Sequence, residues 1–144
     1  MDTFKSDVVT INAAVENVYG KLSNPATLKN IVNIGNIPAE VKEKIDGIEF
    51  DADSISFNAN PIGKMTLKIV ERVELSKIVY SAVTSPIPMK AVINLEKIDD
   101  NTTKAVAELQ MELNMFIRPM VEKPLTEGAK KFGELLAVLP YSQL

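Results

Sequence analysis

The strongest structural signal runs from residue 115 to residue 138, which read MFIRPMVEKPLTEGAKKFGELLAV. Apolar side chains recur there at helical spacing as one broad stripe, made up of Ile117, Met120, Val121, Leu125, Phe132, Leu135, Leu136 and, just beyond the segment, Leu139. Such a stripe predicts one long amphipathic helix. Because a helix of this length spans about 36 Å, we expect it to lie along a sheet rather than to cap one corner.

Two residues inside this segment predict local irregularities, one in the course of the helix and one in its packing against the sheet. Pro124 lies well inside it, where proline removes a backbone donor and crowds the carbonyl four residues earlier. We therefore predict a bend between Met120 and Pro124. Gly128 follows one turn later near the buried face, where the missing side chain either lets the sheet approach closely or leaves space.

The chain before the helix is expected to form an antiparallel sheet. Met65, Leu67 and Ile69 alternate with polar residues, the pattern of a half-buried strand, and this alternation places Arg72 on the outward face. Tight turns such as Asp99-Asp100-Asn101 join consecutive segments into hairpins. Strands are predicted over residues 3–11, 48–50, 54–59, 64–73, 76–84, 89–98 and 102–113.

Helical spacing also occurs near the N-terminus, over residues 13–22. Ser23-Asn24-Pro25 ends that helix and can begin a second one, which would reach about residue 32. Another helical turn or two is predicted over residues 38–44. The predicted architecture is therefore α+β, a single domain over residues 1–144. An antiparallel meander wraps around a long kinked C-terminal helix, and two short helices follow the first strand.

Composition excludes several classes of function. The 144 residues are 46% apolar and 24% charged, with a net charge of −3. This charge balance provides no basic face, so we do not expect a nucleic-acid partner. There is no cysteine and no histidine, which removes thiolate chemistry, the usual transition-metal ligands and imidazole-dependent triads. No apolar run reaches the length of a membrane span. We expect a cytoplasmic protein with no metal and no cofactor, and the composition does not assign an oligomeric state.

This order of elements resembles the START/Bet v 1-like superfamily, also called SRPBCC, and in particular its polyketide cyclase/dehydrase-type branch. The resemblance covers nearly the whole chain. The residues that carry it are Val9-Thr10-Ile11-Asn12-Ala13-Ala14, Val18-Tyr19, Leu22-Ser23-Asn24-Pro25, Asp53-Ser54-Ile55-Ser56-Phe57, Gly63, Glu71-Arg72 and the terminal helix. It implies a helix-grip fold with a cavity for an apolar ligand between sheet and helix. It also implies that a reaction such as cyclisation or dehydration is possible, although the missing histidine excludes the iron-dependent oxygenases of the superfamily.

Two residues are candidates for catalysis. Strict alternation from Met65 would aim Glu71 into the interior, where burial raises the pKa of a carboxyl group and suits it to acid or base work. A single β-bulge would instead turn it outward. Tyr80 shares a face with Ile78 and could orient a substrate oxygen, although such a tyrosine is more often core with a satisfied hydroxyl.

The candidate ligand-binding residues are mostly apolar and include methionines, which give adaptable cavity walls but are also ordinary core residues. They are Phe57, Met65, Leu67, Ile69, Glu71, Tyr80, Met111, Met120 and Phe132. The first hypothesis is a protein that binds a hydrophobic or amphipathic small molecule. The second is a cofactor-free cyclase or dehydratase that uses Glu71 and Tyr80. The third is a protein-interaction module with an exposed apolar patch and no ligand.

Overall fold

The computed structural model describes residues 2–28, 39, 47–59, 63–83, 88–139 and 141. The described part of the chain contains an eight-stranded sheet in the order β1-β8-β7-β6-β5-β4-β3, and β2 pairs with β8 beside β1. Every strand pairing is antiparallel. The strands are β1 (Asp2–Lys5), β2 (Val9–Ile11), β3 (Glu49–Phe50), β4 (Ser54–Ala59), β5 (Gly63–Val73), β6 (Lys77–Ala82), β7 (Met89–Asp99) and β8 (Thr102–Met111).

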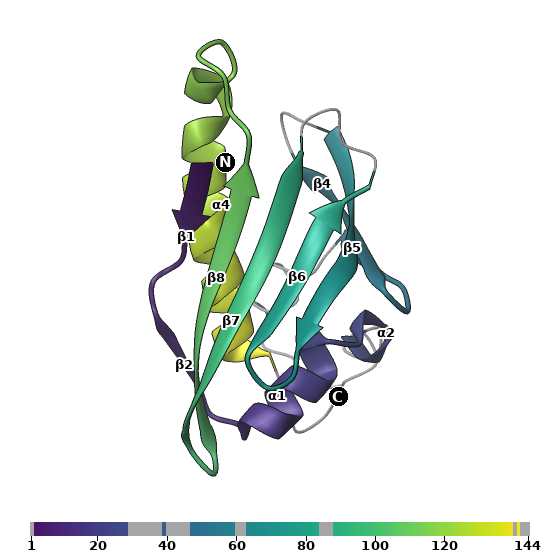
Figure 1. The fold of residues 1–144 in the computed structure, drawn as a ribbon, viewed down its shortest axis with the longest axis vertical. Helices are drawn as coiled ribbons and strands as arrows, with labels where there is room; N and C mark the ends of the chain where they lie inside the picture. Colours follow the sequence, from purple (N-terminus) through teal and green to yellow (C-terminus); the bar gives the residue numbers. More distant parts are fainter. Residues whose placement is uncertain are drawn as a thin grey trace.

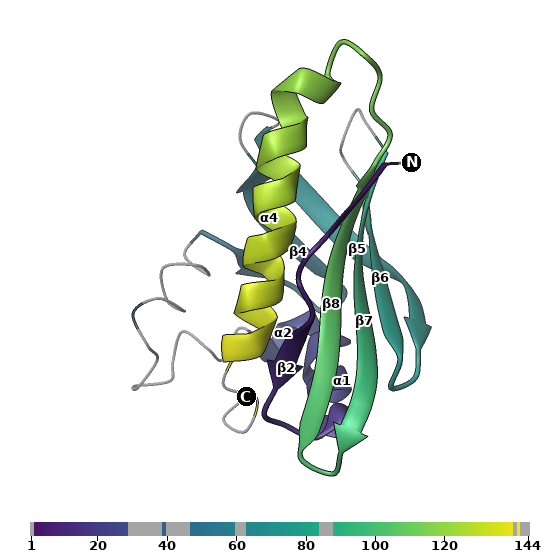
Figure 2. The same ribbon diagram turned by 90° about the vertical axis from the view of Figure 1, so that its left-hand side faces the viewer.

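Three helices accompany the sheet in the described ranges: α1 (Val15–Leu22), α2 (Pro25–Leu28) and the long α4 (Arg118–Val138). In Figure 1 α4 lies behind the sheet, and α1 and α2 close one end of it. Figure 2 shows α4 running along the side of β8 and β2. The helix-grip architecture predicted from the sequence is therefore confirmed. The rest of the second predicted helix lies outside the described residues, and so does the helical turn over 38–44 apart from residue 39, which is helical.

The long helix begins three residues later than its apolar stripe suggested. The Asn114 side chain accepts hydrogen bonds from the backbone N–H groups of Phe116 and Ile117, at 2.9 and 3.0 Å, which holds residues 115–117 in a turn before α4. Pro124 lies inside the helix, and in Figure 2 the first turn of α4 leans away from the line of the rest. No helix in the described ranges is long and apolar enough to cross a membrane.

The first predicted strand is in fact two strands, β1 and β2, which both pair with β8. Between β1 and β2 the regular strand pairing is interrupted at Ser6, and the Ser6 side chain takes over part of the hydrogen bonding. Its Oγ accepts a hydrogen bond from the N–H of Ala107 (2.9 Å) and donates one to the carbonyl of Asp7 (2.8 Å). The Ser6 N–H also donates to the Ala107 carbonyl at 2.8 Å, so both backbone polar groups of Ala107 stay bonded where the edge of the sheet bends.

Helix α4 lies close against the sheet at this bend. An added Cβ on Gly133 would lie 2.5 Å from the Cβ of Ser6, whereas one on Gly128 would meet only the Leu109 side chain, at 3.5 Å. The close approach considered for Gly128 therefore occurs at Gly133. The backbone of α4 lies against β1, β2 and β8.

Candidate functional site

The side of the sheet that faces α4 is a continuous apolar surface, which we call the concave face. Residues directly opposite each other in an antiparallel pair lie on one face, and the register links Phe57 to Met65, Ile69 to Tyr80, and Met89 to Met111. Met65 and Met111 are fully buried, whereas Phe57 is half-buried. Of the predicted ligand-binding residues, the concave face carries Phe57, Met65, Leu67, Ile69, Tyr80 and Met111.

Helix α4 contributes Phe132 to the same space. Residues four apart lie on one side of a helix, and the position of Gly128 faces Leu109 on the concave face. Phe132, one turn later, therefore points the same way, and it is half-buried. Phe57 on β4 and Phe132 on α4 are thus partly exposed aromatic rings on the two sides of the interior.

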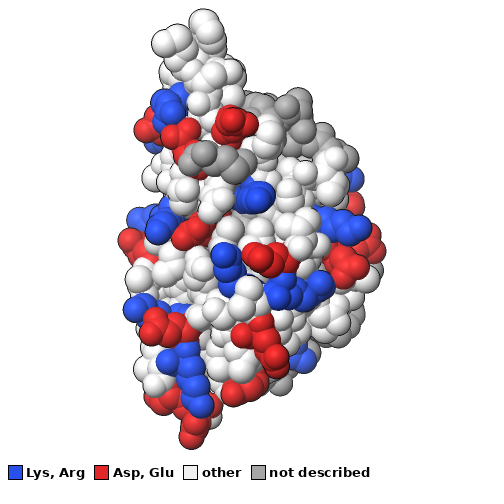
Figure 3. Space-filling view, viewed as in Figure 1, with Lys and Arg blue, Asp and Glu red and all other residues white. Residues whose placement is uncertain are grey.

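The prediction that Met120 lines this space is wrong. Its side chain is 62% exposed, and Met115 and Phe116 are 77% and 80% exposed. We call these three exposed side chains around the start of α4 the apolar tip. In Figure 1 the start of α4 projects beyond the ends of the strands, and this end of the molecule is mostly white in Figure 3. Arg118, at the base of the tip, is paired with Asp2 at 3.0 Å.

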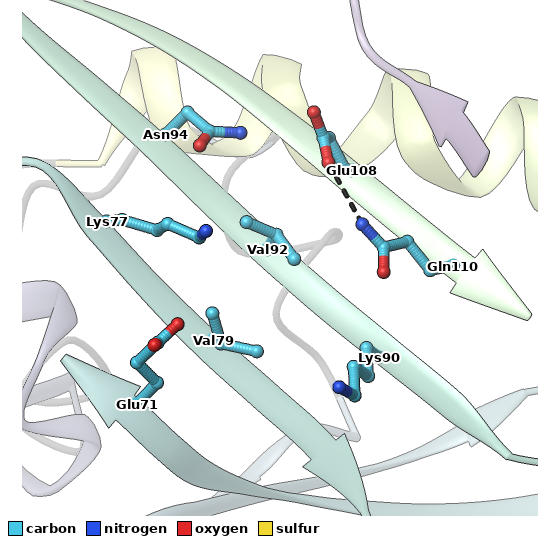
Figure 4. A pocket seen from close by; sticks show the side chains of 8 residues that line it. All are labelled: Glu71, Lys77, Val79, Lys90, Val92, Asn94, Glu108 and Gln110. Atoms are coloured by element: carbon cyan, nitrogen blue, oxygen red, sulfur yellow. Dashed lines mark hydrogen bonds between the residues drawn. The ribbon is translucent and has the colours of Figure 1, made fainter. Parts of the chain in front are cut away.

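The prediction that Glu71 points inward is also wrong. The register between β5 and β6 shifts between Ile69 and Glu71, so that Glu71 lies opposite Val79 on the outer face. The intervening extra residue of a β-bulge reverses the alternation beyond it. Glu71 is exposed and lines an open hollow of about 300 Å³ with Lys77, Lys90 and Glu108, over a floor formed by Val79 and Val92 (Figure 4). Glu71 and Tyr80 therefore lie on opposite faces of the sheet.

Tyr80 lies on the concave face, but its hydroxyl already has a structural partner. The hydroxyl donates a hydrogen bond of 2.8 Å to the carbonyl of Leu22, at the end of α1. Burial raises the pKa of Tyr80 strongly, and the positive charge of Arg72 opposes that rise. The phenol therefore stays protonated and serves as a hydrogen-bond donor rather than as a base.

The same bulge brings Arg72 to the concave side, a position that strict alternation did not predict. Arg72 lies opposite Ile78. Its Nε and Nη2 donate to the carbonyl of Ser23, at 3.1 and 2.9 Å, and Nη2 also contacts the Asp53 carboxylate at 3.1 Å. Tyr80, Arg72 and Asp53 thus gather beside the end of α1, and we call this group the polar end of the concave face.

The remaining chemistry of the described residues is sparse. They contain no cluster of three or more carboxylates that could hold a metal ion. Apart from the polar end, the side chains that the register places on the concave faces of β4, β5 and β6 are apolar. The arrangement can bind an apolar body and present one cationic and one hydroxyl group to it.

Comparison with known proteins gives matches among solved structures. No family model matches the sequence, and no curated protein matches it. A START superfamily protein from Mycobacterium smegmatis superposes with a TM-score of 0.65 at 11% identity, with 94% of each chain covered. This chain therefore has the START/Bet v 1-like fold. Norcoclaurine synthase from Thalictrum flavum, in complex with dopamine and hydroxybenzaldehyde, shares that fold with a TM-score of 0.66 at 9% identity, covering 94% of this chain and 84% of that one.

The START/Bet v 1-like fold also occurs in the di-domain ARO/CYC BexL. That structure matches with a TM-score of 0.68 at 13% identity, and the match covers 95% of this chain but 45% of the longer one. Identities this low concern the fold, because proteins of one fold carry many unrelated functions. Function has to be argued from the residues of the concave face.

Proposed function

We propose that this protein binds a hydrophobic or amphipathic small molecule between the concave face of the sheet and α4. The carrying observation is a set of half-buried apolar side chains beside an otherwise buried apolar face. Helix α4 packs on β1, β2 and β8, while Phe57, Ala82 and Phe132 stay half-buried around the rest of the concave face. Apolar side chains that are neither fully packed nor on the outer surface are typical walls of a ligand site.

A fluorescent probe and two neighbouring substitutions on β6 test this proposal. Ala82 lies opposite Leu67 on the concave face, and Ser81 lies opposite Lys68 on the outer face. Both are half-buried, so each position can accommodate a larger side chain. We expect saturable binding of the neutral apolar dye N-phenyl-1-naphthylamine, weakened about tenfold or more by Ala82→Phe and less than about twofold by Ser81→Phe, because only the first ring enters the site.

Denaturing extraction and mass spectrometry of the purified protein would identify a co-purified ligand independently. Absence of saturable dye binding would contradict the proposal, and so would equal effects of the two phenylalanines, since the dye would then bind elsewhere. Circular dichroism of both variants checks that they keep the wild-type fold.

The geometry does not favour the cyclase or dehydratase hypothesis. That mechanism needs Glu71 and Tyr80 on one cavity, and they lie on opposite faces of the sheet. The Tyr80 hydroxyl is also bonded to Leu22. A proton-transferring group has to come within hydrogen-bond reach of its substrate, which the outward Glu71 cannot do for a ligand on the concave face.

The interaction-module hypothesis has one supporting feature, the apolar tip of Met115, Phe116 and Met120. Three such side chains expose on the order of 400 Å². A stable protein interface buries about 800 Å² on each partner. The apolar tip alone is therefore too small for a stable interface, and ligand binding is the better-supported function.

A further inference from the structure

We propose that the ligand carries a carboxylate, and that this head group binds Arg72 at the polar end while the apolar body lies along the concave face. This inference rests on the proposed ligand-binding function and adds the chemical class of the ligand. Its basis is the asymmetry of the concave face, which is apolar along the strands and has one cation, Arg72, at the end of α1.

Arg72 is fixed in place and still has donors to offer. Its bonds to Ser23 and Asp53 use Nε and Nη2, so the N–H groups of Nη1 take no part in them. A guanidinium has five N–H donors in a rigid fork that matches a carboxylate. Because the guanidinium is already held against α1, a ligand would lose little side-chain entropy in binding it.

The charge of Arg72 acts on the interior side of the sheet. Tyr80 and Arg72 bind consecutive carbonyls, those of Leu22 and Ser23, so the two side chains end close together. The guanidinium charge also lowers the pKa of the buried Tyr80 against the effect of burial. An anionic head group near the Tyr80 hydroxyl would therefore be attracted by the charge of Arg72 and could accept hydrogen bonds from the guanidinium.

Neighbouring cations do not share this position. Lys68 lies opposite Ser81, and Lys77 lines the hollow with Glu71, so both are on the outer face. Among the described residues of β5 and β6, Arg72 is the cation on the concave side. On these two strands, selection of a carboxylate would therefore depend on Arg72.

The existing partner of Arg72 can be displaced or can share the guanidinium. The Arg72 and Asp53 side chains are 41% and 58% exposed, and exposed ion pairs contribute little to stability. A ligand carboxylate can therefore compete with Asp53 for the guanidinium or bind beside it through Nη1.

Three ligands with the same chain and different heads test the inference: dodecanoate, 1-dodecanol and dodecylamine. Each is used to displace N-phenyl-1-naphthylamine from the wild-type protein at pH 8, below its micelle-forming concentration. We expect dodecanoate to bind about tenfold or more tightly than the other two. Arg72→Gln should remove that preference while leaving the affinity for 1-dodecanol within about twofold. The matched control Lys68→Gln, which removes one positive charge from the outer face of the same strand, should keep the preference.

Each outcome decides something. Equal binding of all three ligands to the wild type overturns the carboxylate inference and leaves the proposed function intact, whereas failure of both dye and ligands to bind overturns both. A loss of affinity for all three ligands in Arg72→Gln also overturns the inference, because Arg72 would then support the structure of the site and not bind the carboxylate. If Arg72→Gln does not fold, Asp53→Asn decides: removal of the competing carboxylate should strengthen dodecanoate binding at least twofold, and weaker binding contradicts the inference.

Discussion

Replacing Gly133 with alanine is expected to lower the free energy of unfolding by about 1–3 kcal/mol, the usual result of overpacking a closely packed contact. The methyl group would lie 2.5 Å from the Cβ and 2.6 Å from the Oγ of Ser6. In the middle of a helix the same change ordinarily stabilises a protein by about 1 kcal/mol. The expected change in the free energy of unfolding is therefore opposite in sign to the change that the helix propensities of glycine and alanine predict. Urea denaturation followed by circular dichroism measures the difference.

Ser6 cannot easily move away from the added methyl group. Its N–H donates to the carbonyl of Ala107 at 2.8 Å, and its Oγ is bonded to the Ala107 N–H and the Asp7 carbonyl. A shift large enough to relieve the contact would break at least one of these bonds, and a buried unpaired backbone group costs about 1–3 kcal/mol. The clash therefore has to be absorbed by α4 or by the edge of the sheet.

Two further variants separate this contact from other causes. Gly20 lies in α1 with no heavy atom within 4 Å of an added Cβ, so Gly20→Ala should raise the free energy of unfolding by about 0.5–1 kcal/mol. In a Ser6→Gly background both clashing atoms are gone, and Gly133→Ala should lose its penalty. If the alanine costs the same in both backgrounds, the contact with Ser6 is not the reason.

Most elements of this fold could be predicted from the period of the apolar pattern. The alternation of Met65, Leu67 and Ile69 placed them correctly on the concave face, and the apolar stripe of residues 115–138 located the long helix within three residues. These signals are local, because a half-buried strand buries every second side chain and an amphipathic helix buries one side chain in every three or four. The architecture follows from them, since a long amphipathic helix has to cover a sheet.

The candidate site was less predictable because one extra residue changed it. The bulge between Ile69 and Glu71 exchanged the faces of Glu71 and Arg72, and neither glycine nor proline marks it in the sequence. Gly133 was missed for a similar reason. Its role comes from Ser6, which is remote in sequence and breaks an otherwise strand-like segment. Such features depend on tertiary contacts that no local pattern records.

Raising the pH from 10 to 12 is expected to destabilise this protein steeply through two buried tyrosines. Tyr80 and Tyr141 donate hydrogen bonds to the carbonyls of Leu22 and Leu136, at 2.8 and 2.6 Å. Burial raises the pKa of both phenols above the range of exposed tyrosine, and for Tyr80 the charge of Arg72 partly offsets this. In the unfolded chain tyrosine ionises near pH 10. Both groups therefore support the folded state fully below pH 10, and that support is lost as the pH rises further.

The expected slope follows from proton linkage. While a tyrosine is ionised in the unfolded chain and protonated in the folded one, the free energy of unfolding falls by about 1.4 kcal/mol per pH unit. Two such tyrosines give about twice that slope. Urea midpoints at pH 8, 10, 11 and 12 measure it. In a Tyr19→Phe background, which leaves Tyr80 and Tyr141 as the two tyrosines of the chain, phenolate absorbance near 295 nm should appear together with unfolding.

Tyr80→Phe and Tyr141→Phe identify the source of this loss. Each removes a hydrogen bond to a buried carbonyl and should be less stable than the wild type at pH 8 by about 1 kcal/mol. Each also removes one ionising group, so the difference from the wild type should shrink as the pH rises and can reverse near pH 12. If the slopes of both variants match the wild type, groups other than these two phenols cause the alkaline loss. A shallower slope in both variants would show that these two phenols stay protonated in the folded protein and set its upper pH limit.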